Sequence, residues 1–324
     1  MRGILSLLII LIMVIVAVKV YSQPDYPEAT WNPADPGNYL SSNRGREDVR
    51  WFIIHVAEGS YGGTINWFKN PKARVSAHFV INEAGTHLTQ MVRIKDIAWH
   101  AGNSLYNRYS VGIEIAGYVG STIWPDTLYK NLAKLAVWLH ENYNVALVWV
   151  EGVAPPSPLQ SSGIIGHIQV PDPSNPRVGG GRSHHTDPGS TFNWIKFMNY
   201  VRELYTSLHG LERLNVTIKI VSLSGSPISG ITVRIEGEGE SYLLHTDSEG
   251  RINLKLNPGE YRVRIEKDGV KYDERRMYVV SDAEVCIALP VESGAASSST
   301  LVLTFLLFLA VFIFAYLITG MLNR

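Results

Sequence analysis

Four polar side chains in this sequence lie at the ends or in the middle of apolar segments, where a buried polar group needs a partner. They are His55 in the run 51–59, Glu114 in the run 111–116, His167 at the end of the run 163–167, and Asp187 in a turn ahead of a helix. Residues of these types can hold a metal ion or transfer a proton, which makes them the candidates for chemistry.

Two imidazoles and one carboxylate are the donor set of a catalytic zinc site. His55, His167 and Asp187 would fill three coordination positions and leave the fourth open. Zinc is therefore the predicted cofactor, while a hydrogen-bonded core histidine is the alternative for His55 taken alone. For Glu114, we weigh a structural ion pair against catalysis, because a carboxylate in so apolar a strand is costly without a purpose.

The elements around these residues alternate between strands and helices. Expected strands are 51–59, 76–82, 86–92, 111–116 and 163–167, and expected helices are 64–69, 126–143 and 191–208. This order predicts an α/β domain with a mixed central β-sheet flanked by helices. We assign it to residues 45–209, after an N-terminal arm at 23–44.

The composition changes after this domain. Short alternating strands separated by Gly, Pro and Asp turns predict an all-β sandwich over 210–291. The segments 246–250 and 257–263 resemble the turns of transthyretin-like or carboxypeptidase regulatory-like modules. That resemblance implies a fold and no activity.

Both ends of the chain are strongly apolar. Residues 1–22 have the pattern of a signal peptide, with an uncleaved signal anchor as the alternative. Residues 300–322 are long enough for a transmembrane helix, preceded by a flexible linker at 292–299. We therefore expect a single-pass protein of the cell membrane with both folded domains extracellular.

Charge and cysteine content exclude some classes of protein. The 324 residues have a formal net charge of zero, so no nucleic-acid partner is expected. The only cysteine, Cys286, excludes an intramolecular disulfide.

Six motifs occur in the order of a known family. They are Ile53-Ile54-His55, Ser76-Ala77-His78-Phe79, Ala98-Trp99-His100-Ala101-Gly102, Ser110-Val111-Gly112-Ile113-Glu114, Ile165-Gly166-His167 and Thr186-Asp187-Pro188-Gly189. Over about 45–208 the chain thereby resembles the zinc-dependent N-acetylmuramoyl-L-alanine amidases of the amidase-2 type, a group that includes the peptidoglycan recognition proteins.

The resemblance implies hydrolysis of the peptidoglycan amide between muramic acid and L-alanine, or of a related cell-wall amide. It makes His55, His167 and Asp187 the zinc ligands and Glu114 the catalytic glutamate. Many relatives have a lysine two residues before the aspartate, and here His185 takes that place as a second catalytic residue. The implied substrate-binding residues are His78, Trp99, His100 and Asn107, with a structural role as the alternative for His78.

Two other functions remain open at this point. The first domain could bind cell-wall fragments without cutting them, although such relatives commonly lack a zinc ligand. Alternatively, the protein could be a surface adhesin whose β-sandwich carries the function.

Overall fold

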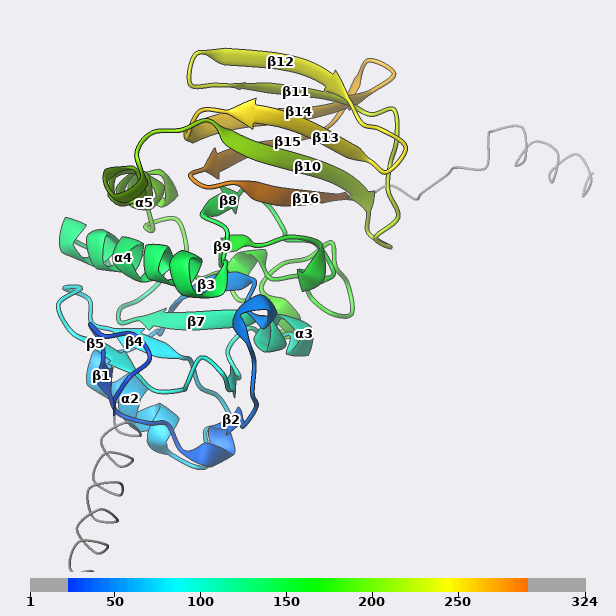
Figure 1. The fold of residues 1–324 in the computed structure, drawn as a ribbon. Helices are drawn as coiled ribbons and strands as arrows, with labels where there is room; N and C mark the ends of the chain where they lie inside the picture. Colours follow the sequence, from blue (N-terminus) through cyan, green and yellow to red (C-terminus); the bar gives the residue numbers. More distant parts are fainter. Residues whose placement is uncertain (1–22, 291–324) are drawn as a thin grey trace, which may run out of the picture.

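A computed structural model of the protein describes residues 23–290. A six-stranded mixed sheet forms the centre of the first half of the chain (Figure 1). Its strands follow the order β1-β5-β4-β7-β3-β9. Their bounds are β1 Thr30–Trp31, β3 Trp51–Val56, β4 Phe79–Ile81, β5 Leu88–Gln90, β7 Ser110–Ile115 and β9 Gly163–Gly166. β3 runs parallel to both β7 and β9, and β4 is antiparallel to β5. The α/β part of the fold prediction is confirmed.

Helices cover both faces of this sheet (Figure 1). The helices are α2 Tyr61–Lys69, α3 Ser104–Arg108, α4 Asp126–Tyr143 and α5 Trp194–His209, and the short strands β2 Tyr39–Leu40 and β6 Ile97–Ala98 pair apart from the sheet. All six residues of β3 are buried. Phe52, Ile54 and Val56 pack into the core formed with α4 and α5. Because side chains alternate along a strand, His55 lies on the opposite face.

The N-terminal arm is packed against the sheet. Strand β1 within it pairs in parallel with β5. Tyr26 is buried in the main core, and the side-chain amide oxygen of Gln90 accepts hydrogen bonds from the backbone of Asp25 and Tyr26. The arm thus forms the edge of the domain, which its Pro- and Asn-rich sequence did not indicate.

The second half is a β-sandwich of a three-stranded and a five-stranded sheet. Its strands are β10 Leu214–Ser222, β11 Thr232–Gly237, β12 Glu240–His245, β13 Arg251–Leu256, β14 Gly259–Lys267, β15 Val270–Val279 and β16 Ala283–Leu289. The three-stranded sheet has the order β13-β10-β16, and the five-stranded sheet ends on β8, Val148–Val150, which belongs by sequence to the first half. β8 pairs with β15 through Met277, Tyr278 and Val279.

Apolar side chains also cross between the two halves. Val148 packs in the core of the sandwich, while Tyr278 and Val280 pack in the core beneath α4 and α5. The Tyr278 hydroxyl donates a hydrogen bond to Asn199 Oδ1 on α5, 2.5 Å away. The halves therefore share buried surface and a sheet.

One part of the predicted fold class is wrong. Among residues 23–290, no helix is both long enough and apolar enough to cross a membrane, so the structure gives no support for a transmembrane helix. α4, with 18 residues, has an exposed polar face that includes Lys130 and Lys134. The predicted span 300–322, the linker 292–299 and the signal peptide 1–22 lie outside the described residues. The extracellular location stays a prediction.

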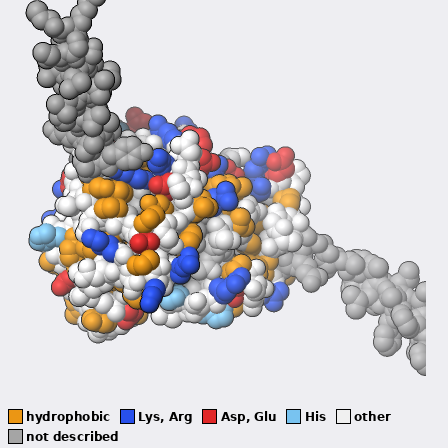
Figure 2. Space-filling model, turned by 90° about the horizontal axis from the view of Figure 1, so that it is seen from below, with side chains coloured by type: hydrophobic (Ala, Val, Ile, Leu, Met, Phe, Trp, Pro, Cys, Tyr) orange, Lys and Arg blue, Asp and Glu red, His pale blue; other side chains and the backbone are white. Residues whose placement is uncertain are grey.

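The face of the molecule in Figure 2 has no large patch of side chains of one charge. Figure 2 shows basic and acidic side chains interspersed with hydrophobic ones on one face of the molecule. This distribution agrees with the formal net charge of zero.

The shared sheet predicts that the two halves unfold together. A chain ending at residue 213 loses the partner of β8 and the packing of Tyr278, so its melting temperature should fall by about 5 °C or more, as expected for a loss of roughly 2 kcal/mol. Calorimetry of the longer and shorter chains tests this. Two separate transitions in the longer chain, one matching the shorter chain, would contradict it.

Candidate metal and catalytic site

The site begins with the register of three parallel strands. His55 on β3 lies directly opposite Glu114 on β7. On the other side of β3, Ile54 pairs with Gly166, the last residue of β9, and His167 follows immediately. Since parallel strands end at the same edge of a sheet, pairing brings both histidines and the glutamate together.

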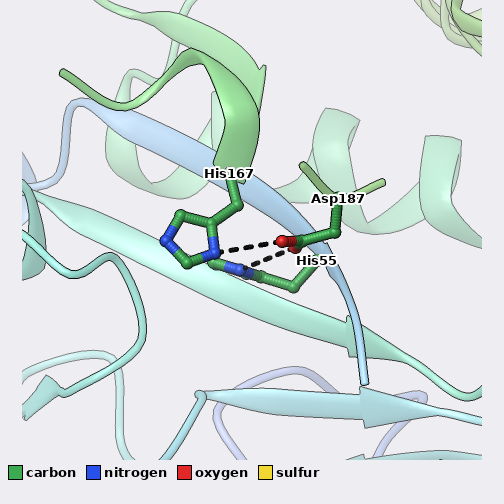
Figure 3. Close-up of side chains that lie close together, drawn as sticks. All are labelled: His55, His167 and Asp187. Atoms are coloured by element: carbon green, nitrogen blue, oxygen red, sulfur yellow. Dashed lines mark ion pairs between the residues drawn. The ribbon is translucent and has the colours of Figure 1, made fainter. Parts of the chain in front are cut away.

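Asp187 joins the two histidines from a loop (Figure 3). Its Oδ2 lies 3.3 Å from His55 Nδ1, and its Oδ1 lies 3.3 Å from His167 Nδ1. All three side chains are buried. A Cβ on Gly166 would approach Pro188 Cδ to 2.4 Å, so the glycine lets the loop with Asp187 pack against the end of β9.

Each of the three residues can supply one ligand atom to a shared metal ion. Two ligand atoms at about 2.0–2.1 Å from one tetrahedral zinc ion would be roughly 3.3 Å apart. The three candidate ligand atoms all lie within 4.8 Å of one another, and this His-His-Asp group could hold a metal ion.

The ionisation of the group also suits a cation. Burial, together with the neighbouring His167, lowers the pKa of His55 to about 4, which leaves the imidazole neutral and able to coordinate. Burial opposes ionisation of Asp187, but the hydrogen bonds from His167 and His55 outweigh it and hold the pKa of Asp187 well below its usual range. The site thus presents a carboxylate and a neutral imidazole at pH 7.

The carboxyl group of Glu114 has a pKa shifted towards neutral. Burial, together with the charge of Asp187, raises the pKa of the half-buried Glu114 to about 8. A carboxyl group with a pKa near neutral can both accept and return a proton. A cation on the neighbouring ligands would favour its ionised form.

These residues face a cavity of about 730 Å³. His55, Glu114, His167 and Asp187 line it together with residues from α2, from the loops after β3 and β7, and from the loop before Asp187. The residues from α2 and from these loops are Ala57, Glu58, Gly59, Gly63, Thr64, Trp67, Phe68, Val119, Ser183, His184, His185 and Thr186. The other residues that line the cavity are Val56, Val75, Ser76, Trp99 and His100. A cavity of this size accommodates a ligand larger than a few atoms.

Comparison with known proteins agrees with this geometry. The family model described as N-acetylmuramoyl-L-alanine amidase matches residues 45–190. N-acetylmuramoyl-L-alanine amidase A of Achromobacter lyticus is 34% identical over 183 residues, which span 55% of this chain and 95% of the relative. The chain belongs to the N-acetylmuramoyl-L-alanine amidase family.

Two further matches share a lower sequence identity with this chain. The 1,6-anhydro-N-acetylmuramyl-L-alanine amidase AmpD of Haemophilus influenzae is 27% identical over 135 residues, which span 40% of this chain and 60% of the relative. A crystal structure of an AmpD derivative matches with 24% identity and a TM-score of 0.40, over 54% of this chain and 96% of its own. The match to the Achromobacter lyticus amidase confirms the predicted family, while the resemblance of the sandwich to transthyretin-like modules stays a prediction.

His100 of the amidase contacts the ring nitrogen of His55 that points away from Asp187. Its Nδ1 lies 2.9 Å from His55 Nε2, and its Nε2 lies 3.2 Å from the hydroxyl of Ser110. If Nδ1 of His55 faces the metal, its Nε2–H donates to His100, which fixes the tautomer of the ligand. A Cβ on Gly112 would come within 2.5 Å of the His100 ring, so the glycine makes room for this contact. His100 lines the cavity, but both of its nitrogens are engaged.

Two of the predicted substrate-binding residues do not line the cavity. His78 is fully buried; its Nδ1 accepts from the backbone N–H of Gly112, which leaves Nε2–H to donate to Asp96 O, 3.2 Å away. Asn107 Oδ1 accepts the backbone N–H groups of His100 and Ala101. Both side chains are thus engaged by backbone groups, and their contact with substrate stays a prediction.

Trp99, another predicted substrate-binding residue, lines the cavity, and so does His185, the second predicted catalytic residue. The ring of His185 stacks on that of His167 with centroids 4.6 Å apart, and its Nδ1 lies 3.8 Å from Asp187 Oδ1. Burial, together with the neighbouring His167, lowers the pKa of His185. A neutral imidazole there can still donate one N–H to a substrate oxygen.

The loop that carries His185 is constrained by hydrogen bonds. His184 Nε2 lies 2.8 Å from Asp172 Oδ2, and the backbone N–H of His185 donates to Gly180 O. A Cβ on Gly180, where φ is +85°, would meet the backbone of His185 at 2.3 Å. The position of His185 thus depends on close backbone contacts that only glycine permits.

Two residues of the cavity wall, Trp67 and Glu58, had no role assigned from sequence. Trp67 is half exposed on α2, whose buried face is formed by Ile65 and Phe68. A tryptophan on the solvent side of a short amphipathic helix was the available signal for Trp67. No comparable pattern in the sequence pointed to Glu58.

The contact between His100 and His55 predicts a change in metal affinity. Replacing His100 with alanine removes the acceptor for His55 Nε2–H, so zinc affinity should fall about 10- to 100-fold. Competition with a chelating dye measures it, with His209→Ala as the control because His209 is exposed and pairs with Glu141. An unchanged zinc affinity combined with a raised KM would instead assign His100 to substrate contact.

Proposed function

We propose that this amidase uses zinc to hydrolyse the amide that joins the lactyl group of muramic acid to L-alanine in peptidoglycan. The observation that carries the proposal is the His55–His167–Asp187 group, with ligand atoms within 4.8 Å of one another, beside Glu114 on one cavity. The family supports the reaction, because the relatives described above are named for it.

The proposed division of roles follows from the donors present. His55, His167 and Asp187 would hold the zinc, which when bound supplies Lewis acidity towards the amide carbonyl and acidifies water. Glu114 would take a proton from the attacking water and deliver it to the departing amine. His185 would donate a hydrogen bond to the carbonyl oxygen as negative charge develops there.

Substrate binding would use the cavity wall formed by α2 and its neighbours. Trp67 and Trp99 provide apolar surface at this wall, on which a sugar ring or a peptide backbone can pack. His100 would hold His55 in place, so it would act through the ligand.

Product analysis tests the reaction. The zinc-loaded protein should release a free L-alanine amino group and a free lactyl carboxylate from muramoyl peptides, both detectable by mass spectrometry. Glu114→Gln should keep its zinc and lower kcat by about 10²- to 10⁴-fold, because it removes the proton acceptor. Glu141→Gln, on the exposed surface of α4, is the matched control.

Two outcomes would contradict the proposal. Stoichiometric zinc and binding of wall fragments without any cleavage would identify a recognition module. Full activity of Glu114→Gln would exclude the proposed proton transfer.

A further inference from the structure

The charged side chains of the cavity are all acidic, apart from its histidines. Carboxylates of Glu58, Glu114 and Asp187 line it, and none of the described residues that line it is lysine or arginine. Arg182 lies in the neighbouring turn but does not line the cavity. A substrate carboxylate would therefore meet no cationic side chain on these walls.

The three carboxylates are not equivalent. Asp187 is buried between two imidazoles, and Glu114 is half-buried beside His55 on the sheet. Glu58 is exposed at the rim, in the loop that follows β3. It is the carboxylate that a substrate group can reach without entering the metal site.

Glu58 is held in a fixed position. Its Oε1 accepts the backbone N–H of Val119 at 2.9 Å. On either side of it, the N–H of Ala57 donates to Ile115 O, and Gly59 exchanges two backbone hydrogen bonds with Gly117. The loops after β3 and β7 thus form one wall, and Glu58 Oε2 is not used in that bond.

The backbone at Glu58 is unfavourable for a side chain. Its φ is +49°, in the left-handed region that glycine occupies readily and glutamate does not. Such a conformation persists where the surroundings impose it, and it is common at functional sites. Glycine at this position would relieve the strain, yet the chain has glutamate.

We propose that Glu58 selects substrates whose peptide carries an ammonium group over those that carry a neutral or acidic group at the same place. The inference rests on the proposed function, because it takes the peptide of a muramoyl peptide as the ligand. The ammonium group would donate to the carboxylate of Glu58. An exposed pair of this kind favours the charged ligand about 2- to 5-fold.

A structural role for Glu58, limited to holding Val119, is the competing explanation. Glu58→Gln separates the two, because the amide oxygen of glutamine can still accept the Val119 N–H while the negative charge is gone. Glu236→Gln, on β11 of the sandwich, removes one exposed charge far along the chain and serves as the control.

Binding is measured on zinc-loaded protein with Glu114→Gln, so that no turnover interferes. The probes are muramoyl-L-alanyl-D-isoglutaminyl-L-lysine and its Nε-acetyl derivative, compared by calorimetry. The lysine peptide should bind about 2- to 5-fold more tightly, and high salt should reduce the preference. Adding Glu58→Gln should bring the ratio to about one, and adding Glu236→Gln should leave it unchanged.

Each result bears on a different claim. Equal binding of the two peptides, no binding of either, or a preference that survives Glu58→Gln overturns the role of Glu58, even if wild-type protein cleaves both. A preference that Glu58→Gln removes, in a protein whose wild type cleaves neither peptide, supports the role of Glu58 and overturns the proposed hydrolysis.

Discussion

The parallel pairing of β3 with β7 and β9 is the constraint on which the site depends. The register sets His55 opposite Glu114 and places His167 one residue beyond the pairing of Ile54 with Gly166. A slip of one residue would turn His55 towards α4 and α5 and expose apolar side chains to the cavity. Burial of the other face of β3 beneath these helices therefore holds the ligands in place.

Asp187 supplies the negative charge of the site. Its carboxylate stays ionised in a buried place, beside a His55 whose pKa has fallen to about 4. A carboxylate next to the neutral imidazole of His55 is suited to a metal cation. The same negative charge contributes to the raised pKa of Glu114, so metal binding and the ionisation of Glu114 are coupled.

Much of this arrangement can be predicted from sequence. Buried strands that end in histidine, a glutamate inside another strand and an aspartate before a helix give the residues of the site, and motif order gives the family. The predicted helix 126–143 has the same bounds as α4 in the structure. Each of these features can be recognised within one segment of the chain, from the order and periodicity of its side chains.

The features that sequence does not reveal depend on contacts between distant segments. β8 looks like part of the first domain, but it pairs with β15, more than a hundred residues later. His78 belongs to a family motif, yet its ring bonds to the backbone of Gly112 and Asp96 rather than facing the cavity. The wall formed by Glu58 and Val119 exists because the loops after two parallel strands meet.

The zinc content of wild-type protein and of Asp187→Asn tests the central claim most directly. Both proteins would be loaded with zinc, dialysed and measured by elemental analysis, with Asp126→Asn as the control for loss of an exposed carboxylate. The account predicts about one zinc ion per wild-type or control chain, as three protein ligands support, and none retained by Asp187→Asn. Equal zinc content in all three proteins would contradict the assignment of the site.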